Sequence, residues 1–321
     1  MEKIWIRDFV EGQLVESTFL VQEKNILLGK NGRPYMALTL ADRTGTIDAR
    51  AWDRVEELAR EFSAGDVVWV KGQVQSYQNR KQFVIHKIQK DSTENKDMSL
   101  YMDQSERNSE KSLAELRQII GTLQNSHLKQ LVTDSVEDPE VRVRLMKSPA
   151  AKTIHHAWPG GLLEHMVSIC KIMDFMAIHY SFLNRDLLIF GAIFHDFGKL
   201  WELEDNGGIH YTDRGRLIGH MEIACELIDK KASRILGFPE ELRDLCKHIV
   251  LSHHGKLEYG SPKRPKFLEA LVVALVDDLD SKINTVESFV KSERMQTSEK
   301  WSRYNSLFDR YFLLEDLKNK F

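Results

Sequence analysis

The second half of this chain carries an ordered set of side chains that can bind divalent metal ions. Imidazole suits first-row ions from manganese to zinc, and carboxylates suit harder ions and can bridge two of them. The set contains no cysteine, which favours manganese, iron or cobalt over structural zinc. Its members are His165, His195, Asp196, His220, His253, His254 and Asp277.

His195 and Asp196 follow an apolar segment, 187–194, whose hydrophobicity on all sides predicts a buried helix. Neighbouring residues of a helix point about 100° apart, so the pair can address two ions, or one ion and a bridge. His253 and His254 repeat this arrangement at the end of another predicted helix, just before a glycine. Each pair can therefore present two ligands from one helix end.

Asp277 lies inside a long apolar helix predicted over 268–283. An unpaired buried carboxylate there would cost several kcal/mol, and metal coordination supplies the partner that it needs. A lone histidine on a helix is more often a hydrogen-bonded core residue than a ligand. The metal-site hypothesis therefore depends on the whole ordered set. Histidines outside that order are interpreted as surface or structural residues: His127, His179, His210 and His248.

The chain has 321 residues, which is long enough for two domains with cores of their own. Hydrophobic residues make up 42% and charged residues 29%, as is typical of globular proteins. The net charge of -3 excludes a general basic surface that would attract nucleic acid. Any nucleic-acid site must therefore be local.

Three cysteines lie among apolar residues without the spacing of a zinc or redox motif, which favours buried thiols in a reducing cytoplasm. They are Cys170, Cys225 and Cys246. The N-terminus lacks the apolar run of a signal peptide, and no stretch reaches the ~18 apolar residues of a membrane span. We therefore expect a cytoplasmic protein without a membrane partner.

The first ~90 residues alternate apolar and polar side chains with the period of β-strands. Turn-forming residues separate five predicted strands, and a helix over 53–62 falls between the third and the fourth. Five short strands with one helix in that place is the order of an OB-fold barrel. The later four strands are predicted over 34–41, 45–52, 66–77 and 81–88.

A polar segment, 91–110, is interpreted as a linker, and the pattern beyond it is helical. The fold class is therefore multidomain α+β, with a five-stranded N-terminal barrel followed by an all-α domain. Helices are predicted over 162–179, 185–195, 218–236, 239–253 and 265–289. The expected divisions are a barrel at 1–90, a linker with connecting helices at 91–148, a metal-bearing domain at 149–290 and a helical tail at 291–321.

The His195-Asp196 pair stands in Phe-His-Asp-Phe-Gly-Lys, with a separate histidine before it and an aspartate after it. This order resembles the HD-domain superfamily of metal-dependent phosphohydrolases over roughly residues 150–288. The resemblance implies two ions per chain, with Mn²⁺ favoured and Fe²⁺ or Co²⁺ as alternatives. Ligands of the first ion would be His165, His195, Asp196 and Asp277. Ligands of the second would be His220, His253 and His254, with Asp196 as the bridge.

The last aspartate ligand has two close rivals, Asp278 and Asp280. Asp277 is preferred because Val-Asp follows the apolar run, as in the family pattern. Two ions about 3.5–4 Å apart would activate a bridging water and stabilise the attacking and leaving oxygens at phosphorus. Asp196 would thus serve catalysis as well as metal binding.

Two further residues are candidates for contact with the phosphate. Lys199 lies one helical turn beyond His195 and can neutralise a phosphate oxygen, although it could also be a solvated residue at a helix end. His156, in the pair His155-His156, could contact the phosphate or the leaving group, or be structural.

The predicted barrel has the residues of a single-strand binding face, because OB folds combine a positive groove with aromatic rings that stack on bases. The alternative is that Trp52, Trp69 and Phe83 belong to the barrel core and the cations are ordinary surface. The clustering of cations with aromatic residues favours the binding face. The candidates are Arg33, Tyr35, Arg50, Trp52, Lys71, Tyr77, Arg80, Lys81 and Phe83.

A barrel fused to an HD domain resembles the YhaM family of bacterial 3′-to-5′ exoribonucleases. The motifs that carry the resemblance are Gly-Gly-Leu-Leu-Glu-His (160–165), His-Asp-Phe-Gly-Lys (195–199), Leu-Ile-Gly-His (217–220), Leu-Ser-His-His-Gly-Lys (251–256), Gly-Ser-Pro-Lys (260–263) and Asp-Asp-Leu-Asp-Ser-Lys (277–282). It implies metal-dependent removal of 5′-monophosphates from the 3′ ends of single-stranded RNA, with single-stranded DNA as a second substrate class.

Other functions stay open at this point. An HD phosphohydrolase acting on nucleotides or cyclic dinucleotides could share the helical domain, but the barrel would then be unexplained. A non-catalytic RNA-binding protein would not need so many ligands. No residue identifies the 2′-hydroxyl, so RNA and DNA are not distinguished. Homo-oligomer formation is also open.

Overall fold

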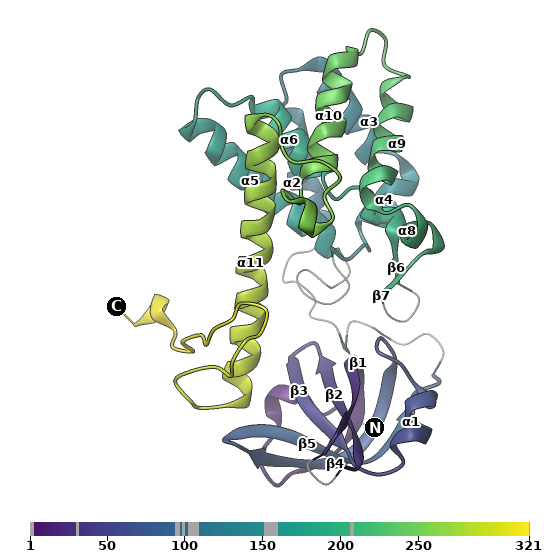
Figure 1. Ribbon diagram of the computed structural model, residues 1–321, viewed down its shortest axis with the longest axis vertical. Coiled ribbons are helices and arrows are strands. Elements are labelled where there is room, and N and C mark those ends of the chain that lie inside the picture. Colours follow the sequence, from purple (N-terminus) through teal and green to yellow (C-terminus); the bar gives the residue numbers. More distant parts are fainter. Residues whose placement is uncertain are drawn as a thin grey trace. The chain divides into compact units, whose positions relative to one another are not determined.

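The computed structural model describes residues 3–29, 32–93, 97, 100–101, 109–150, 160–205 and 209–320. They form two compact units, which are described separately (Figure 1). One unit combines Met1–Gln104 with Val286–Phe321, and the other is Ser105–Thr285. The segment predicted as a helical tail, 291–321, therefore packs with the N-terminal barrel. The prediction of helix is wrong for most of it, because α11 ends at Gln296 and isolated β-bridges follow.

The first unit contains a closed barrel with strand order β1-β2-β3-β5-β4, which confirms the predicted OB fold. A helix, α1, separates β3 from β4, and β3 pairs with β5 in parallel while the other neighbours are antiparallel. The elements are η1 (Ile6–Asp8), β1 (Leu14–Leu28), β2 (Pro34–Asp42), β3 (Gly45–Ala51), α1 (Val55–Glu61), β4 (Val67–Tyr77) and β5 (Arg80–Lys90).

The interior of the barrel is built by alternation along each strand, because successive side chains of a strand point to opposite faces. Met36, Leu38 and Leu40 of β2 are buried inward, as the sequence predicts. Ile47 and Ala49 of β3 are buried beside them. At the intervening positions Thr39 and Asp48 are partly exposed, whereas Ala37 and Ala41 are buried as well.

The C-terminal segment of the first unit packs against β3 and the β4–β5 turn. Arg80 forms a 2.6 Å ion pair with Glu293, whose side chain is fully buried. Gly45 lies close to the segment, because an added Cβ would lie 2.3 Å from the Met295 methyl carbon and would require that side chain to move. The last helix, α11 (Leu268–Gln296), belongs to both units, and η4 (Leu317–Asn319) follows it.

The second unit is helical, with one short hairpin. Its elements are α2 (Ser109–Gly121), α3 (Ser126–Val136), α4 (Pro139–Leu145), α5 (Gly161–His179), α6 (Arg185–Phe194), α7 (Lys199–Glu202), β6 (Leu203–Asp205), β7 (Ile209–Tyr211), α8 (Asp213–Leu217), α9 (His220–Ala232), α10 (Glu240–Ser252), η3 (Leu257–Tyr259) and the first part of α11. The chain is therefore an OB barrel followed by a helical domain, as predicted.

Helix α6 lies at the centre of this unit and is buried along its apolar segment, as its composition predicts. Asn184 begins it by accepting hydrogen bonds from two backbone amides of its first turn. Gly191 lets neighbouring helices come close, because an added Cβ would lie 2.5 Å from Val273 and 3.0 Å from Ile249. This packing fixes the helix whose end carries His195.

The three cysteines are buried and unbonded, in agreement with the thiol interpretation. Burial raises the pKa of all three, that of Cys225 to about 12, so they stay protonated at neutral pH. Across the described ranges, no helix combines the length and the apolar character that crossing a membrane requires.

Candidate metal centre

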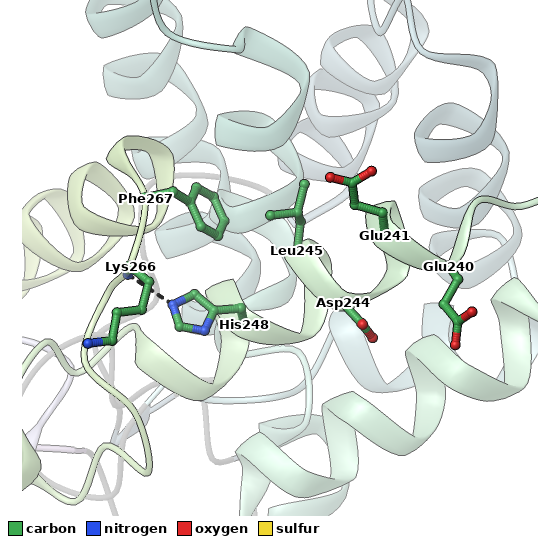
Figure 2. Close-up of a pocket in the computed structure, with 7 residues that line it drawn as sticks. All are labelled: Glu240, Glu241, Asp244, Leu245, His248, Lys266 and Phe267. Atoms are coloured by element: carbon green, nitrogen blue, oxygen red, sulfur yellow. Dashed lines mark hydrogen bonds between the residues drawn. The ribbon is translucent and has the colours of Figure 1, made fainter.

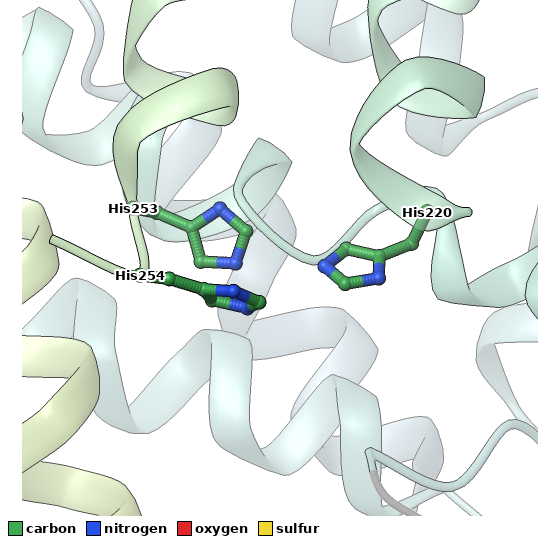
Figure 3. A group of neighbouring side chains, drawn as sticks. All are labelled: His220, His253 and His254. Atoms are coloured by element: carbon green, nitrogen blue, oxygen red, sulfur yellow. The ribbon is translucent and has the colours of Figure 1, made fainter. Parts of the chain in front are cut away.

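The seven predicted ligands gather in two groups within the helical unit. The ligand atoms of each group lie within 4.8 Å of one another. Figure 3 shows the group of three histidines, whose rings converge from the start of α9 and the end of α10. The first group is His165, His195, Asp196 and Asp277, and the second is His220, His253 and His254.

The first group has the spacing of ligands around one ion. Nε2 of His165 lies 3.2 Å from Nε2 of His195 and 3.2 Å from Oδ1 of Asp277. The separation between His195 and Asp277 is 3.6 Å. Nitrogen and oxygen ligands about 2.1 Å from a common ion lie roughly 3–3.5 Å apart. The three side chains are therefore arranged as if around one cation.

Asp196 lies between the two groups and turns one oxygen to each. Its Oδ2 is 3.5 Å from Nε2 of His195 and 3.8 Å from Nε2 of His165. Its Oδ1 is 3.6 Å from Nε2 of His220 and 3.6 Å from Nε2 of His253. This is the geometry of a carboxylate that bridges two ions.

Three histidines are oriented by backbone carbonyls. Nδ1 of His195 donates to Gly191 O at 3.0 Å, and Nδ1 of His253 donates to Val250 O at 2.7 Å. Nδ1 of His254 donates to Tyr259 O at 2.9 Å. A carbonyl oxygen only accepts, so the proton of each neutral ring is at Nδ1 and the lone pair is at Nε2. The rings are thus preset as Nε2 ligands.

The other two histidines are held by carboxylates. Asp280 accepts from Nδ1 of His165 at 2.9 Å and is itself held by the Ser168 hydroxyl at 2.6 Å. Both carboxylate oxygens of Glu202 lie 3.1 Å from Nδ1 of His220. A carboxylate behind a histidine fixes its ring and raises its basicity toward a metal. The sequence analysis predicted Asp280 only as an alternative metal ligand. It did not predict a role for Glu202, because no motif includes this residue.

Among the three candidates for the last ligand, the geometry favours Asp277. Its Oδ1 lies within the first group, whereas Asp280 lies behind His165. Asp278 is exposed and pairs with Lys282 at 2.6 Å.

Buried polar atoms at the centre fit a cation. Among the described residues, Asp196 Oδ1, His220 Nε2 and His253 Nε2 are buried without a hydrogen-bond partner. Such atoms cost free energy unless something satisfies them. All three atoms carry lone pairs and face one another. A metal ion can accept all three lone pairs, whereas one water molecule can donate only two hydrogen bonds. The residues therefore fit two divalent ions.

The pKa directions agree with sites for cations. Burial would raise the pKa of Asp196, but Lys199 and His195 outweigh it and hold that pKa well below its usual range. Burial lowers the pKa of His253, and burial with the nearby His253 and His220 lowers that of His254 to about 4. The aspartate is therefore ionised and these two histidines are neutral at pH 7, as ligands must be.

Lys199 is not the solvated residue of the alternative interpretation, because its side chain is only 15% exposed and its Nζ lies 2.6 Å from Asp196 Oδ2. Burial would lower the pKa of Lys199, but the Asp196 charge outweighs it and raises that pKa. Lys199 is therefore a charged group at the centre. His155 and His156 lie outside the described residues.

The two carboxylates behind the histidines give a testable effect on metal binding. We expect Glu202→Gln and Asp280→Asn each to weaken metal affinity about 10–100-fold, because the neutral amide orients the ring less firmly and lowers its basicity. Competition titration of purified protein with a metal indicator measures it. Glu204→Gln and Asp278→Asn, at exposed neighbouring positions, are matched controls. Unchanged affinity in Glu202→Gln and Asp280→Asn would contradict the positioning role.

Comparison with known proteins agrees with both units. The HD-domain family matches residues 162–282, and the OB-fold nucleic acid binding domain family matches residues 10–91. The chain is 33% identical to the 3′-5′ exoribonuclease YhaM of Listeria monocytogenes, over 94% of this chain and 98% of that protein. This chain belongs to the YhaM family. The YhaM proteins of Halalkalibacterium halodurans and Bacillus subtilis are 31% and 32% identical over 94% of the chain, covering 93% and 95% of their own lengths.

The barrel of this YhaM-family chain carries one exposed aromatic pair. Trp52, just after β3, is 52% exposed and stacks on Tyr35 of β2 with ring centroids 4.7 Å apart. The Arg50 guanidinium lies 6.0 Å from the Tyr35 ring. Arg33, which precedes β2, is exposed as well. Three of the predicted residues, Tyr35, Arg50 and Trp52, therefore lie together.

The other predicted barrel residues have different surroundings. Phe83 is 0% exposed and packs against Phe9 in the core, so its predicted role in base stacking is wrong. Arg80 is engaged by Glu293, and the Lys81 ammonium donates to Phe9 O at 2.7 Å. Lys71 pairs with Glu16 at 3.1 Å, whereas Tyr77 is exposed on β4. The predicted residues that remain candidates for a binding face are therefore centred on the Tyr35–Trp52 pair.

A surface hollow of about 610 Å³ in the helical unit contains none of the seven predicted ligands (Figure 2). Its charged rim is mainly acidic, and His248 accepts a 3.0 Å hydrogen bond from the Lys266 amide beside it. An acidic rim repels phosphate, so this hollow is not a second phosphate site. Its lining is Glu240, Glu241, Asp244, Leu245, His248, Lys266 and Phe267.

Proposed function

We propose that this protein is a divalent-metal-dependent 3′-to-5′ exoribonuclease that releases 5′-nucleoside monophosphates from single-stranded RNA, with single-stranded DNA as a weaker substrate. The observation that carries the proposal is Asp196, which turns one oxygen to each of two ligand groups. The chain also belongs to the YhaM family, whose matched members are named 3′-5′ exoribonucleases.

The ligand sets suit manganese first and iron or cobalt next, because they offer nitrogen and oxygen without sulfur. His165, His195 and Asp277 would hold one ion and the second histidine group the other, with Asp196 shared. A pair of bound ions supplies an activated water and neutralises charge on the attacking and leaving oxygens. The water oxygen gives up a proton and bonds to phosphorus, and the P–O3′ bond breaks. The released O3′ takes up a proton, so the products are a 5′-monophosphate and a shortened strand with a 3′-hydroxyl.

The remaining candidate residues are proposed to position the RNA strand and to neutralise the charge of its phosphate. The partly buried Lys199 pairs with Asp196 and is proposed to approach a non-bridging phosphate oxygen when a strand binds. His156 is proposed to contact the phosphate or the leaving oxygen. The barrel face around Tyr35 and Trp52 is proposed to hold the strand through base stacking.

We also propose a cytoplasmic location, which is supported by the three buried cysteines that form no disulfide.

The direct test incubates purified protein with single-stranded RNA labelled at the 5′ end, with Mn²⁺ or with a chelator. We expect a ladder that shortens from the 3′ end, mononucleotide 5′-phosphates as products, and no reaction with the chelator. The same oligonucleotide as DNA is expected to react more slowly. Hydrolysis of free nucleotides or cyclic dinucleotides without attack on RNA would overturn the proposal in favour of a small-molecule phosphohydrolase.

The barrel face predicts a defect in strand binding alone. We expect Trp52→Ala to raise the KM for a 30-nucleotide RNA roughly tenfold, since base stacking contributes ~1–3 kcal/mol per base. Hydrolysis of uridine 5′-(p-nitrophenyl phosphate), which has no further nucleotides, should stay at the wild-type rate. Trp301→Ala removes a comparably exposed tryptophan of the C-terminal segment and is the control. An unchanged KM in Trp52→Ala would refute the binding face.

A further inference from the structure

The segment that follows α10 and His254 is strongly basic. Between positions 255 and 266, here called the basic loop, four cations accompany a single carboxylate, that of Glu258. The cations are Lys256, Lys263, Arg264 and Lys266, all exposed. The whole chain has a net charge of -3, so this concentration of positive charge is local. Within the described part of the chain, no ion pair engages any of the four.

The basic loop is tied directly to a ligand histidine. Its Tyr259 carbonyl accepts the 2.9 Å hydrogen bond from Nδ1 of His254, whose ring converges with those of His220 and His253 (Figure 3). The Lys256 amide also donates to the His254 carbonyl at 2.9 Å. The first turn of the loop therefore lies directly beside the histidine group of the candidate metal centre.

Several hydrogen bonds hold the loop in one conformation. The buried hydroxyl of Ser261 donates to Leu251 O at 3.1 Å, and the Lys263 amide donates to the same carbonyl at 3.1 Å. The Lys266 amide donates to His248 at the far end (Figure 2). Gly255 and Gly260 supply the positive φ angles, 74° and 82°, that its two turns require. A fixed loop loses little conformational entropy when it binds a ligand.

The loop also presents an aromatic ring. Tyr259 is 61% exposed, and the Lys256 ammonium lies 5.3 Å from its ring centroid. An exposed ring beside lysine and arginine is the combination that proteins use to bind single strands, in which the ring stacks on a base and the cations contact phosphates. The acidic hollow beyond Lys266 does not share this character.

We propose that the basic loop is a strand-binding subsite on the 5′ side of the scissile phosphate. Tyr259 stacks on a base there, and Lys263 and Arg264 contact phosphates, with Lys256 beside the ring. The inference rests on the proposed nuclease function and adds to it a site that delivers the strand to the metal centre. It belongs to the helical unit, whereas the barrel face belongs to the first unit.

The test compares two substrates in the full-length protein. One is a ten-nucleotide RNA, and the other is uridine 5′-(p-nitrophenyl phosphate), which lacks nucleotides on the 5′ side. In Lys263→Ala/Arg264→Ala, the ratio of kcat/KM for the RNA to that for the ester should fall roughly tenfold. The dependence of log KM on log salt should become shallower by about 1.4, at ~0.7 for each lost phosphate contact on a single strand.

The matched control is Lys230→Ala/Arg234→Ala, which removes two exposed cations near the far end of α9, roughly 15 Å along the helix from His220. Its substrate ratio should equal that of the wild type. Tyr259→Ala should lower the ratio by about tenfold, while Tyr259→Phe, which keeps the ring, should restore most of it.

The outcomes separate this inference from the proposed function. If the wild type degrades RNA and both loop variants keep its ratio and salt dependence, the subsite is refuted while the nuclease function stands. If the wild type hydrolyses only the ester, the nuclease function fails. Binding of a 5′-fluorescent decamer in EDTA then decides on the loop: weaker binding by Lys263→Ala/Arg264→Ala than by the control supports it, and equal binding overturns it.

Discussion

Asp196→Ala is expected to reduce RNA hydrolysis by more than about 10³-fold, and to lower the metal content measured by elemental analysis. The reason is geometric, because this carboxylate faces both ligand groups, with Oδ2 near His165 and His195 and Oδ1 near His220 and His253. Removing it takes one ligand from each proposed ion and the bridge between them. The rate of mononucleotide release at saturating Mn²⁺ measures the loss.

A control is needed because Asp196 also neutralises buried Lys199, and breaking a buried ion pair can cost 3–5 kcal/mol of stability. Circular dichroism melting should therefore accompany the kinetics, with Asp196→Asn as the milder substitution. Asp278→Ala removes an exposed carboxylate and should retain activity. A folded Asp196→Ala protein with wild-type turnover would exclude the two-ion centre. Loss of activity in Asp278→Ala would show that the ligand geometry has been misread.

The order of the ligands could be predicted from sequence because each sits where a helix begins or ends, or inside one whose apolar face is evident. His195 and Asp196 follow the all-round apolar α6, and His253 follows α10. The strands of the barrel could also be predicted from the sequence, because alternation with a period of two and turn-forming residues are local signals. Choosing Asp277 over Asp280 needed the family pattern, because both lie on the same helix.

The residues behind the ligands were not predictable, because they are long-range partners without a spacing rule. Asp280 reaches His165 across 115 positions, and Glu202 reaches His220 across a hairpin. Glu293 engages Arg80 from 213 residues away, which removes a cation from the predicted binding face. Phe83 was different: it shares its strand face with Ile85, and that parity could have identified it as a core residue.

Lys199→Ala is expected to lower kcat by roughly 10²–10³ while both ions stay bound, because a preorganised buried cation stabilises charge that develops in the transition state. Lys199 lies on the turn that follows the His-Asp pair, 2.6 Å from Asp196 Oδ2. Lys199→Arg should recover little, since a guanidinium is bulkier and spreads its charge over a planar fork. Single-turnover cleavage of a short oligonucleotide with a 3′-hydroxyl measures the chemical step.

Lys247→Ala is the matched control, because Lys247 also pairs with a carboxylate, that of Asp229, at 2.6 Å. It should cleave at the wild-type rate. Metal content must be measured in parallel, because loss of Lys199 leaves Asp196 with one positive neighbour fewer. A slow Lys199→Ala enzyme with full metal content assigns the lysine to the transition state. Wild-type cleavage would mean that Lys199 only balances the charge of Asp196, and a slow enzyme with depleted metal would mean that it organises the ligands.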